Sequence, residues 1–182
     1  MTVSNRHSHF IALKVPHLEG LRGLVEKAPP GIRWYDEGDL HLVVASLGPM
    51  EPSRTDAVLE AIEAIEFKPI KVRLSRLVPL PHRRRPASFS FQIDLGHHAV
   101  GVFIREHRER LIRTAGGKPD EGKLSPCITV ARPPLRAEPA ALDRLLGWID
   151  AQAPLDDKIL LSELALYRAQ EDNLADFQLL GP

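Results

Sequence analysis

The sequence predicts a single α+β domain over residues 1–182, built from two similar α/β lobes around a central cleft. Strand-like and helix-like segments alternate with a similar rhythm along both halves of the chain, which indicates the two lobes. Turn-rich joints within 32–47 and 158–179 are typical of hairpins. They favour mixed or antiparallel sheets over the doubly wound parallel sheet that alternating helices and strands also fit.

The first half contains four predicted strands and two predicted helices. Each strand is an apolar, β-forming run that ends at Pro, Gly or Asp, and each helix has apolar residues at helical spacing. The clearest strand signal is strict alternation, with Ile70, Val72 and Leu74 on one face. The predicted strands are 9–15, 32–35, 40–47 and 70–80, and the predicted helices are 18–27 and a longer one capped by Ser53 and running to about 67.

The second half also contains four predicted strands and two predicted helices. We expect strands at 89–95, 124–131, 158–167 and 174–179, and helices at about 98–113 and 139–151. The lobes are placed at roughly 1–80 and 87–182, with the chain crossing between them near 81–86.

Composition excludes several classes of protein. Lys and Arg together number 24, as do Asp and Glu, so no net field attracts the chain to nucleic acid or to a membrane. One cysteine excludes an internal disulfide and favours a reducing compartment. The polar start of the chain lacks a secretion signal, and no apolar run approaches membrane-spanning length. We expect a cytoplasmic monomer that contacts no membrane.

Two short strands hold the candidate chemistry, His41-Leu42-Val43-Val44 and Cys127-Ile128-Thr129-Val130. They occupy equivalent places in the two halves. Residues i and i+2 of a strand point to the same face, so His41 accompanies Val43 and Cys127 accompanies Thr129. If the lobes pack with these strands side by side, the four side chains converge on one cleft.

Segments along nearly the whole chain support one family resemblance. They are Phe10–Leu13, Trp34 with Asp39-Leu40-His41-Leu42 and Leu47-Gly48, the run Ser125–Arg132, and the closing Ser162–Tyr167. In this order they resemble the two-histidine (2H) phosphoesterases, specifically the bacterial RNA 2′,3′-cyclic phosphodiesterases also described as 2′-5′ RNA ligases. That family has a His-x-Thr/Ser motif in each lobe.

The resemblance implies hydrolysis of a cyclic phosphodiester by acid–base catalysis. One histidine activates the attacking water or hydroxyl, and the other protonates the departing oxygen. Imidazole suits both roles because it titrates near neutral pH. The Thr/Ser hydroxyls donate hydrogen bonds to phosphate oxygens. The implied substrates are RNA with cyclic phosphate ends or small nucleotides, and neither a metal nor another cofactor is needed.

Only half of the motif residues are present. His41 matches the first histidine and Thr129 the second hydroxyl, whereas Val43 replaces the first hydroxyl and Cys127 the second histidine. A thiol can donate a proton but cannot mimic an imidazolium. Losing one acid–base group costs about 10²–10⁴ in rate. With one imidazole left, we expect a single pH limb near the reference histidine pKa of ~6.5.

Cys127 has two further interpretations. A cysteine phosphatase needs a Cys-x₅-Arg loop, but the next arginine, Arg132, gives Cys-x₄-Arg on a strand, so a nucleophilic role is excluded. Cys127 can instead simply fill the vacated histidine site. His41 and Thr129 have similar alternatives, as an ordinary core or surface histidine and an ordinary β-branched strand residue.

Three more residues are candidates for substrate binding, beside Val43. Arg132 ends the second motif strand, where the family often has a basic residue near phosphate, and the alternative is a solvated charge. Arg84 lies in the Arg83–Arg85 run, which can contact an RNA backbone or remain solvated. Phe10 can stack on a base or pack in the core. The remaining histidines lack the spacing of metal ligands, so no metal site is predicted.

Two functions from different classes therefore remain open. The first is a cyclic phosphodiesterase that depends on His41, with Thr129 and Cys127 assisting. The second is an RNA- or nucleotide-binding module that keeps the cleft and has lost turnover. The retained His41 favours the enzyme, and the changes at Val43 and Cys127 favour the binding module.

Overall fold

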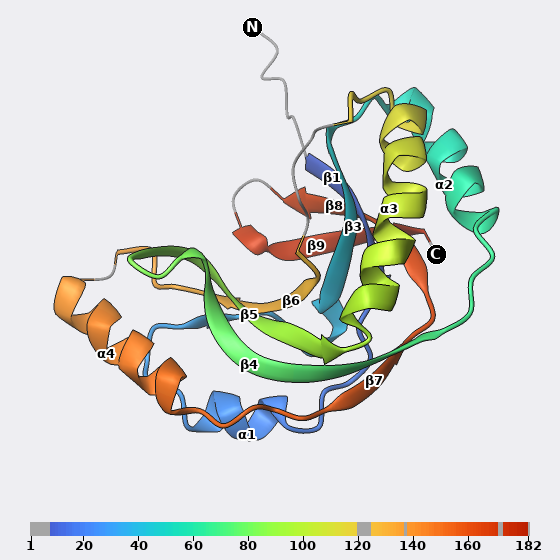
Figure 1. Cartoon of the computed structure of the whole chain (residues 1–182). Helices are drawn as coiled ribbons and strands as arrows, with labels where there is room; N and C mark the ends of the chain where they lie inside the picture. Colours follow the sequence, from blue (N-terminus) through green and yellow to red (C-terminus); the bar gives the residue numbers. More distant parts are fainter. Residues whose placement is uncertain (1–7, 120–124, 137, 171–172, 182) are drawn as a thin grey trace, which may run out of the picture.

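The computed structural model of the chain describes residues 8–119, 125–136, 138–170 and 173–181. Within these residues it contains two antiparallel sheets and four α-helices, which confirms the predicted α+β class (Figure 1). No helix in this part of the chain has the length and apolarity needed to cross a membrane.

The first sheet has the strand order β3-β1-β8-β9. Its strands are β1 (Ser8–Lys14), β3 (His41–Pro49), β8 (Leu164–Gln170) and β9 (Asn173–Gly181). β1 lies inside this sheet and pairs with β3 on one side and with β8 on the other. Its apolar residues are buried on both faces, with Ile11 and Leu13 in one cluster and Phe10 and Ala12 in another, which explains why it appears in the sequence as a continuous apolar run.

The second sheet has the order β2-β6-β5-β4-β7. Its strands are β2 (Arg33–Trp34), β4 (Ile70–His82), β5 (Arg85–Leu95), β6 (Cys127–Arg132) and β7 (Lys158–Leu161). β4 and β5 form a long hairpin that curves strongly (Figure 1). The predicted alternation holds in β4, where Val72 and Leu74 are buried and Lys71 is exposed.

The predicted lobe boundaries are wrong, because each sheet takes strands from both halves of the chain. The segment 81–86 is the turn of the β4–β5 hairpin and lies within one sheet. The segment 158–167, predicted as one strand, divides into β7 in the second sheet and β8 in the first. Hydrogen bonding between strands distant in sequence sets this arrangement, and local patterns do not encode it.

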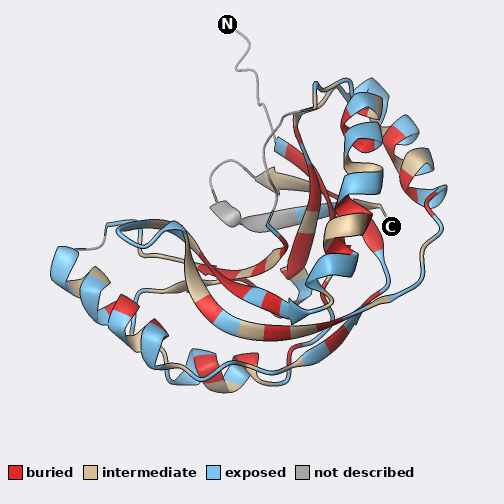
Figure 2. Ribbon diagram, viewed as in Figure 1, coloured by how far each residue is buried: buried red, intermediate tan, exposed pale blue. Residues whose placement is uncertain are grey.

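The helices are α1 (Leu21–Glu26), α2 (Thr55–Glu63), α3 (His97–Thr114) and α4 (Pro139–Ala151). Each buries an apolar stripe and exposes its other side (Figure 2). The predicted cap at Ser53 is wrong: Ser53 lies in a 3₁₀ turn, and α2 begins at Thr55 without a side-chain cap.

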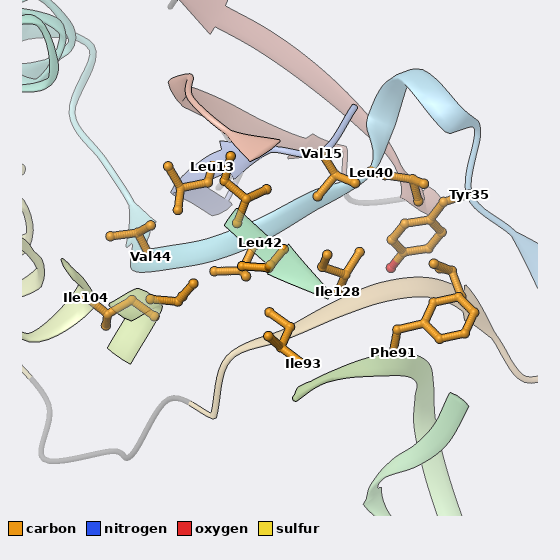
Figure 3. Close-up of a cluster of buried hydrophobic side chains, with 14 of the residues drawn as sticks. Leu13, Val15, Tyr35, Leu40, Leu42, Val44, Phe91, Ile93, Ile104 and Ile128 are labelled. Carbon is orange, nitrogen blue, oxygen red and sulfur yellow. The ribbon is translucent and has the colours of Figure 1, made fainter. Parts of the chain in front are cut away.

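One large core joins the two sheets and the four helices. Leu42 and Val44 of β3 and Ile128 of β6 all belong to it, together with Ile104 of α3 (Figure 3). β3 and β6 lie against each other although they belong to different sheets. The core therefore fixes the relation between the two motif strands.

Candidate functional site

His41 is the first residue of β3, where it pairs with Lys14 of β1. Leu42 and Val44 are fully buried in the main core, so alternation turns His41 and Val43 to the other face of the first sheet. That face has its own small apolar cluster, whose buried members are Phe10, Ala12, Ala165 and Tyr167, and against which Val43 packs.

Aromatic rings surround the His41 imidazole. The centroid of its ring lies 4.7 Å from that of Phe10, 5.4 Å from that of Tyr167 and 6.4 Å from that of Tyr35. Phe10 and Tyr167 also stack on each other at 5.1 Å. These contacts leave only 6% of His41 exposed and hold its ring in place.

A hydrogen bond selects the tautomer of His41. Nδ1 lies 2.6 Å from the backbone oxygen of Asp39. A carbonyl oxygen only accepts, so Nδ1–H is the donor and the lone pair of the neutral ring is on Nε2.

Burial, with a smaller contribution from the nearby charge of Arg132, lowers the pKa of His41 to about 4, against the opposing effect of the hydrogen bond to Asp39. His41 is therefore neutral at pH 7. The value expected from the sequence, ~6.5, is wrong because the aromatic cluster removes water from the ring.

The second motif strand, β6, lies with Ile128 and Val130 in the core and with Cys127 and Thr129 half-buried. Thr129 pairs with Ser90 of β5, and their hydroxyl oxygens are 2.9 Å apart. Ser90 is fully buried.

Cys127 precedes Thr129 by two residues on β6, which pairs with β5. Burial raises the pKa of Cys127, and the hydrogen bond with Ser90 lowers it by less. Cys127 is thus a neutral thiol at pH 7 and does not supply a thiolate nucleophile.

Arg132, at the end of β6, lies against Tyr35. Its Nε–H donates to the Tyr35 hydroxyl oxygen at 2.8 Å, and its guanidinium carbon is 5.9 Å from the centre of the Tyr35 ring. The backbone N–H of Tyr35 in turn donates to Val130 of β6 at 2.9 Å. Tyr35 therefore connects β6 with the rings around His41.

The packing of β3 on β6 relates the two motifs. Leu42 and Ile128 share the main core (Figure 3). The charge of Arg132, at the end of β6, acts on His41 of β3. Convergence of His41 and Val43 with Cys127 and Thr129 on one cleft stays a prediction.

Arg84 lies elsewhere. It occupies the β4–β5 turn and lines a cavity with Arg83 and with Pro139, Leu142, Asp143 and Leu146 of α4. Figure 1 shows this turn at the end of the molecule away from β3. Substrate binding by Arg84 remains a prediction.

Three residues around the motif side chains, Tyr35, Tyr167 and Ser90, were not predicted from the sequence as parts of the site. Only Ser90 had a local signal, as a polar residue between Phe89 and Phe91 on an alternating strand. Among the described residues, the structure forms no group of three or more His, Cys, Asp or Glu side chains able to hold a metal ion.

No family model matches the sequence, and no curated protein matches it. Solved structures do match. E. coli LigT complexed with 3′-AMP is 16% identical, with a TM-score of 0.70 over 96% of this chain and 95% of that one. The chain has the LigT fold.

Two further structures support this assignment. TT0787 of Thermus thermophilus has a TM-score of 0.70 and 16% identity over 95% of this chain and 94% of that one. A structure described as a phosphoesterase has a TM-score of 0.70 and 16% identity over 96% of this chain and 94% of that one. The fold resemblance seen in the sequence is thus confirmed, and it extends over almost the full length of both chains.

Proposed function

We propose that this chain is a cyclic phosphodiesterase that hydrolyses 2′,3′-cyclic phosphate ends of RNA or small cyclic nucleotides, with His41 as its proton acceptor. The observation that carries the proposal is the hydrogen bond from His41 Nδ1–H to the backbone oxygen of Asp39. It holds the neutral imidazole in the tautomer whose Nε2 can accept a proton.

In the proposed reaction, water attacks phosphorus while His41 Nε2 takes its proton. The bond between phosphorus and one ribose oxygen breaks, that oxygen takes a proton from solvent water, and the product is a phosphomonoester. The hydroxyl of Thr129 donates to a nonbridging oxygen, and the positive charge of Arg132 stabilises the phosphate. The departing oxygen has no imidazole to protonate it, so we expect slow turnover.

Substrate binding strengthens the base. A phosphate anion beside His41 favours the imidazolium and offsets the effect of Arg132, which lowers the pKa of the free histidine. We therefore expect the pKa of His41 to be higher in the complex than in the free protein.

The relatives in fold support a function in phosphate chemistry. E. coli LigT has been solved with 3′-AMP and with phosphate, and a phosphoesterase shares the fold. At this level of identity the likeness concerns the fold, so the residues of this chain must carry the function.

A second candidate, a nucleotide-binding module without turnover, is favoured by two observations. Val43 packs on the aromatic cluster where the family has a hydroxyl, and the Cys127 thiol stays protonated. Both changes remove catalytic groups and leave His41, Thr129 and Arg132 for binding. A cytoplasmic location and a monomeric state also remain proposals.

One experiment separates these candidates. The protein is incubated with 2′,3′-cyclic AMP and with RNA bearing a cyclic phosphate end, and the monophosphate product is followed by chromatography beside a binding measurement. Product formation supports the enzyme. Binding without product supports the module, and neither binding nor product overturns both.

A further inference from the structure

The guanidinium of Arg132 is fixed to a neighbouring segment at one of its nitrogen atoms. Its Nε–H donates a hydrogen bond to the hydroxyl oxygen of Tyr35 at 2.8 Å, and its central carbon lies 5.9 Å from the centre of the Tyr35 ring. Tyr35 directly follows β2, in which Arg33 pairs with Arg132 of β6. The backbone N–H of Tyr35 also donates to the oxygen of Val130 at 2.9 Å. Backbone pairing therefore sets the position of the phenol relative to Arg132.

The bond at Nε leaves the two terminal nitrogens of the guanidinium for other partners. Arginine has five N–H donors in a planar fork, and the terminal groups carry four of them. In the part of the chain that the structure describes, no carboxylate forms an ion pair with Arg132. A long arginine side chain loses conformational entropy when it binds an anion. The bond to Tyr35 removes part of this cost before a ligand arrives.

Tyr35 also relates this cation to His41. The ring centroids of Tyr35 and His41 are 6.4 Å apart, and the charge of Arg132 lowers the pKa of His41. Tyr35 itself is buried in the main core, so its ring is held in place by packing. The guanidinium is thus kept close to the residue that accepts a proton in the proposed reaction.

We propose that Tyr35 is a positioning residue, whose hydroxyl holds the guanidinium of Arg132 near His41 and leaves its terminal N–H groups for the phosphate of a bound nucleotide. The proposal deepens the proposed function and rests on it for the role of Arg132 in binding phosphate. The hydrogen bond between Tyr35 and Arg132 exists without substrate, so its effect can be tested separately.

Titration of His41 tests this positioning without a ligand. The ring resonance that is absent from His41→Gln identifies this residue in NMR spectra. Tyr35→Phe keeps the ring and removes the acceptor, so Arg132 can turn towards solvent and the pKa of His41 should rise. Arg132→Met should raise it too. Arg33→Met is the matched control, because the Nε–H of Arg33 donates to the oxygen of Pro133, and it should leave the pKa unchanged.

A double variant distinguishes positioning from a general loosening of the site. Looser packing would also raise the pKa of His41, by admitting water, but it would do so whether or not Arg132 is present. In an Arg132→Met background, Tyr35→Phe should therefore cause no further rise. An equal rise in that background, or an unchanged pKa in a folded Tyr35→Phe protein, would overturn the proposal and leave the proposed function intact.

The second arm measures binding of adenosine 3′-monophosphate and of inorganic phosphate by calorimetry. Tyr35→Phe should weaken both about fivefold, the effect of losing one orienting hydrogen bond. Arg132→Lys keeps the positive charge but has no Nε–H, so it should show a similar loss and provides the test if Tyr35→Phe does not fold. In Arg132→Met, adding Tyr35→Phe should weaken binding no further, and additive losses would contradict the proposal.

The two arms fail in different ways. A wild-type protein that binds neither ligand would refute the proposed function and, with it, the role of Arg132 towards phosphate. The titration of His41 would still decide whether Tyr35 holds the guanidinium in place.

Discussion

The protonation state of His41 follows from its surroundings. Phe10, Tyr35 and Tyr167 exclude water from the imidazole, and this desolvation lowers its pKa to about 4. Since kcat/KM reports the free enzyme, its acid limb should lie near pH 4 and not near ~6.5. The same aromatic burial raises the pKa of Tyr167 to about 12, so that phenol stays protonated.

The lowered pKa of His41 predicts a pH-dependent stability. Between pH 4 and about 6.5 the unfolded chain binds more protons at this residue than the folded chain does, so the free energy of unfolding rises with pH in this window. The contribution of neutral His41 to the free energy of unfolding is complete above about pH 6.5 and is lost as the pH falls towards 4.

Urea unfolding at pH 7 and pH 4.5 measures this effect. His41→Gln, whose amide can still donate to Asp39, should reduce the stability difference between the two pH values by about 2 to 3 kcal/mol. An equal pH dependence in the variant and the wild type would show that His41 is not buried as a neutral group.

The two departures from the family motifs lead to a gain-of-function prediction. Val43→Thr with Cys127→His restores a second hydroxyl and a second imidazole. We expect at least a tenfold increase in hydrolysis of 2′,3′-cyclic AMP, because a decade of rate corresponds to only about 1.4 kcal/mol of barrier. Product formation by the double variant is compared with that by each single variant and by the wild type. A folded double variant with no increase in hydrolysis would favour the binding module.

At the scale of elements, the turn between β5 and α3 depends on Gly96. Its φ is 84°, and a Cβ added there would lie 2.4 Å from the backbone oxygen of Lys71 in β4. Gly96→Ala should therefore lower the free energy of unfolding by about 1 to 3 kcal/mol.

Gly147 provides the matched control for that substitution. It lies inside α4, and an added Cβ would meet no atom within 4 Å. Gly147→Ala should raise the free energy of unfolding by up to about 1 kcal/mol, because alanine favours the helix. An unchanged or higher urea midpoint in Gly96→Ala would show that the assigned geometry of the β5–α3 turn is wrong.

The elements also show what local sequence can specify. The bounds of α4 were predicted correctly, because Pro139 marks its first turn and its apolar spacing is regular. The alternation of β4 and the strand positions of both motifs were likewise readable. The division into lobes could not be predicted in this way, since the pattern of a strand identifies which face is buried but not which strand lies beside it in the sheet.

At the scale of the whole molecule, the site depends on contacts between segments distant in sequence. Tyr35 meets Arg132, and Ser90 meets Thr129, only because β2, β6 and β5 are neighbours in one sheet. No spacing in the sequence predicts these pairs. His41, Thr129 and Arg132 could be predicted because they lie at or beside the positions of the family motifs. The residues that contact them could not, because those contacts arise only when the chain is folded.

The proposed function depends on His41 as the group that accepts a proton during hydrolysis. The most direct test is turnover of 2′,3′-cyclic AMP by the wild type and by His41→Gln, with binding of adenosine 3′-monophosphate measured on the same samples. We expect the variant to lose turnover and to bind within about tenfold of the wild type, because a proton-transfer group acts mainly in the transition state. Full turnover by a folded His41→Gln protein would contradict this role of His41 and place the proton chemistry elsewhere.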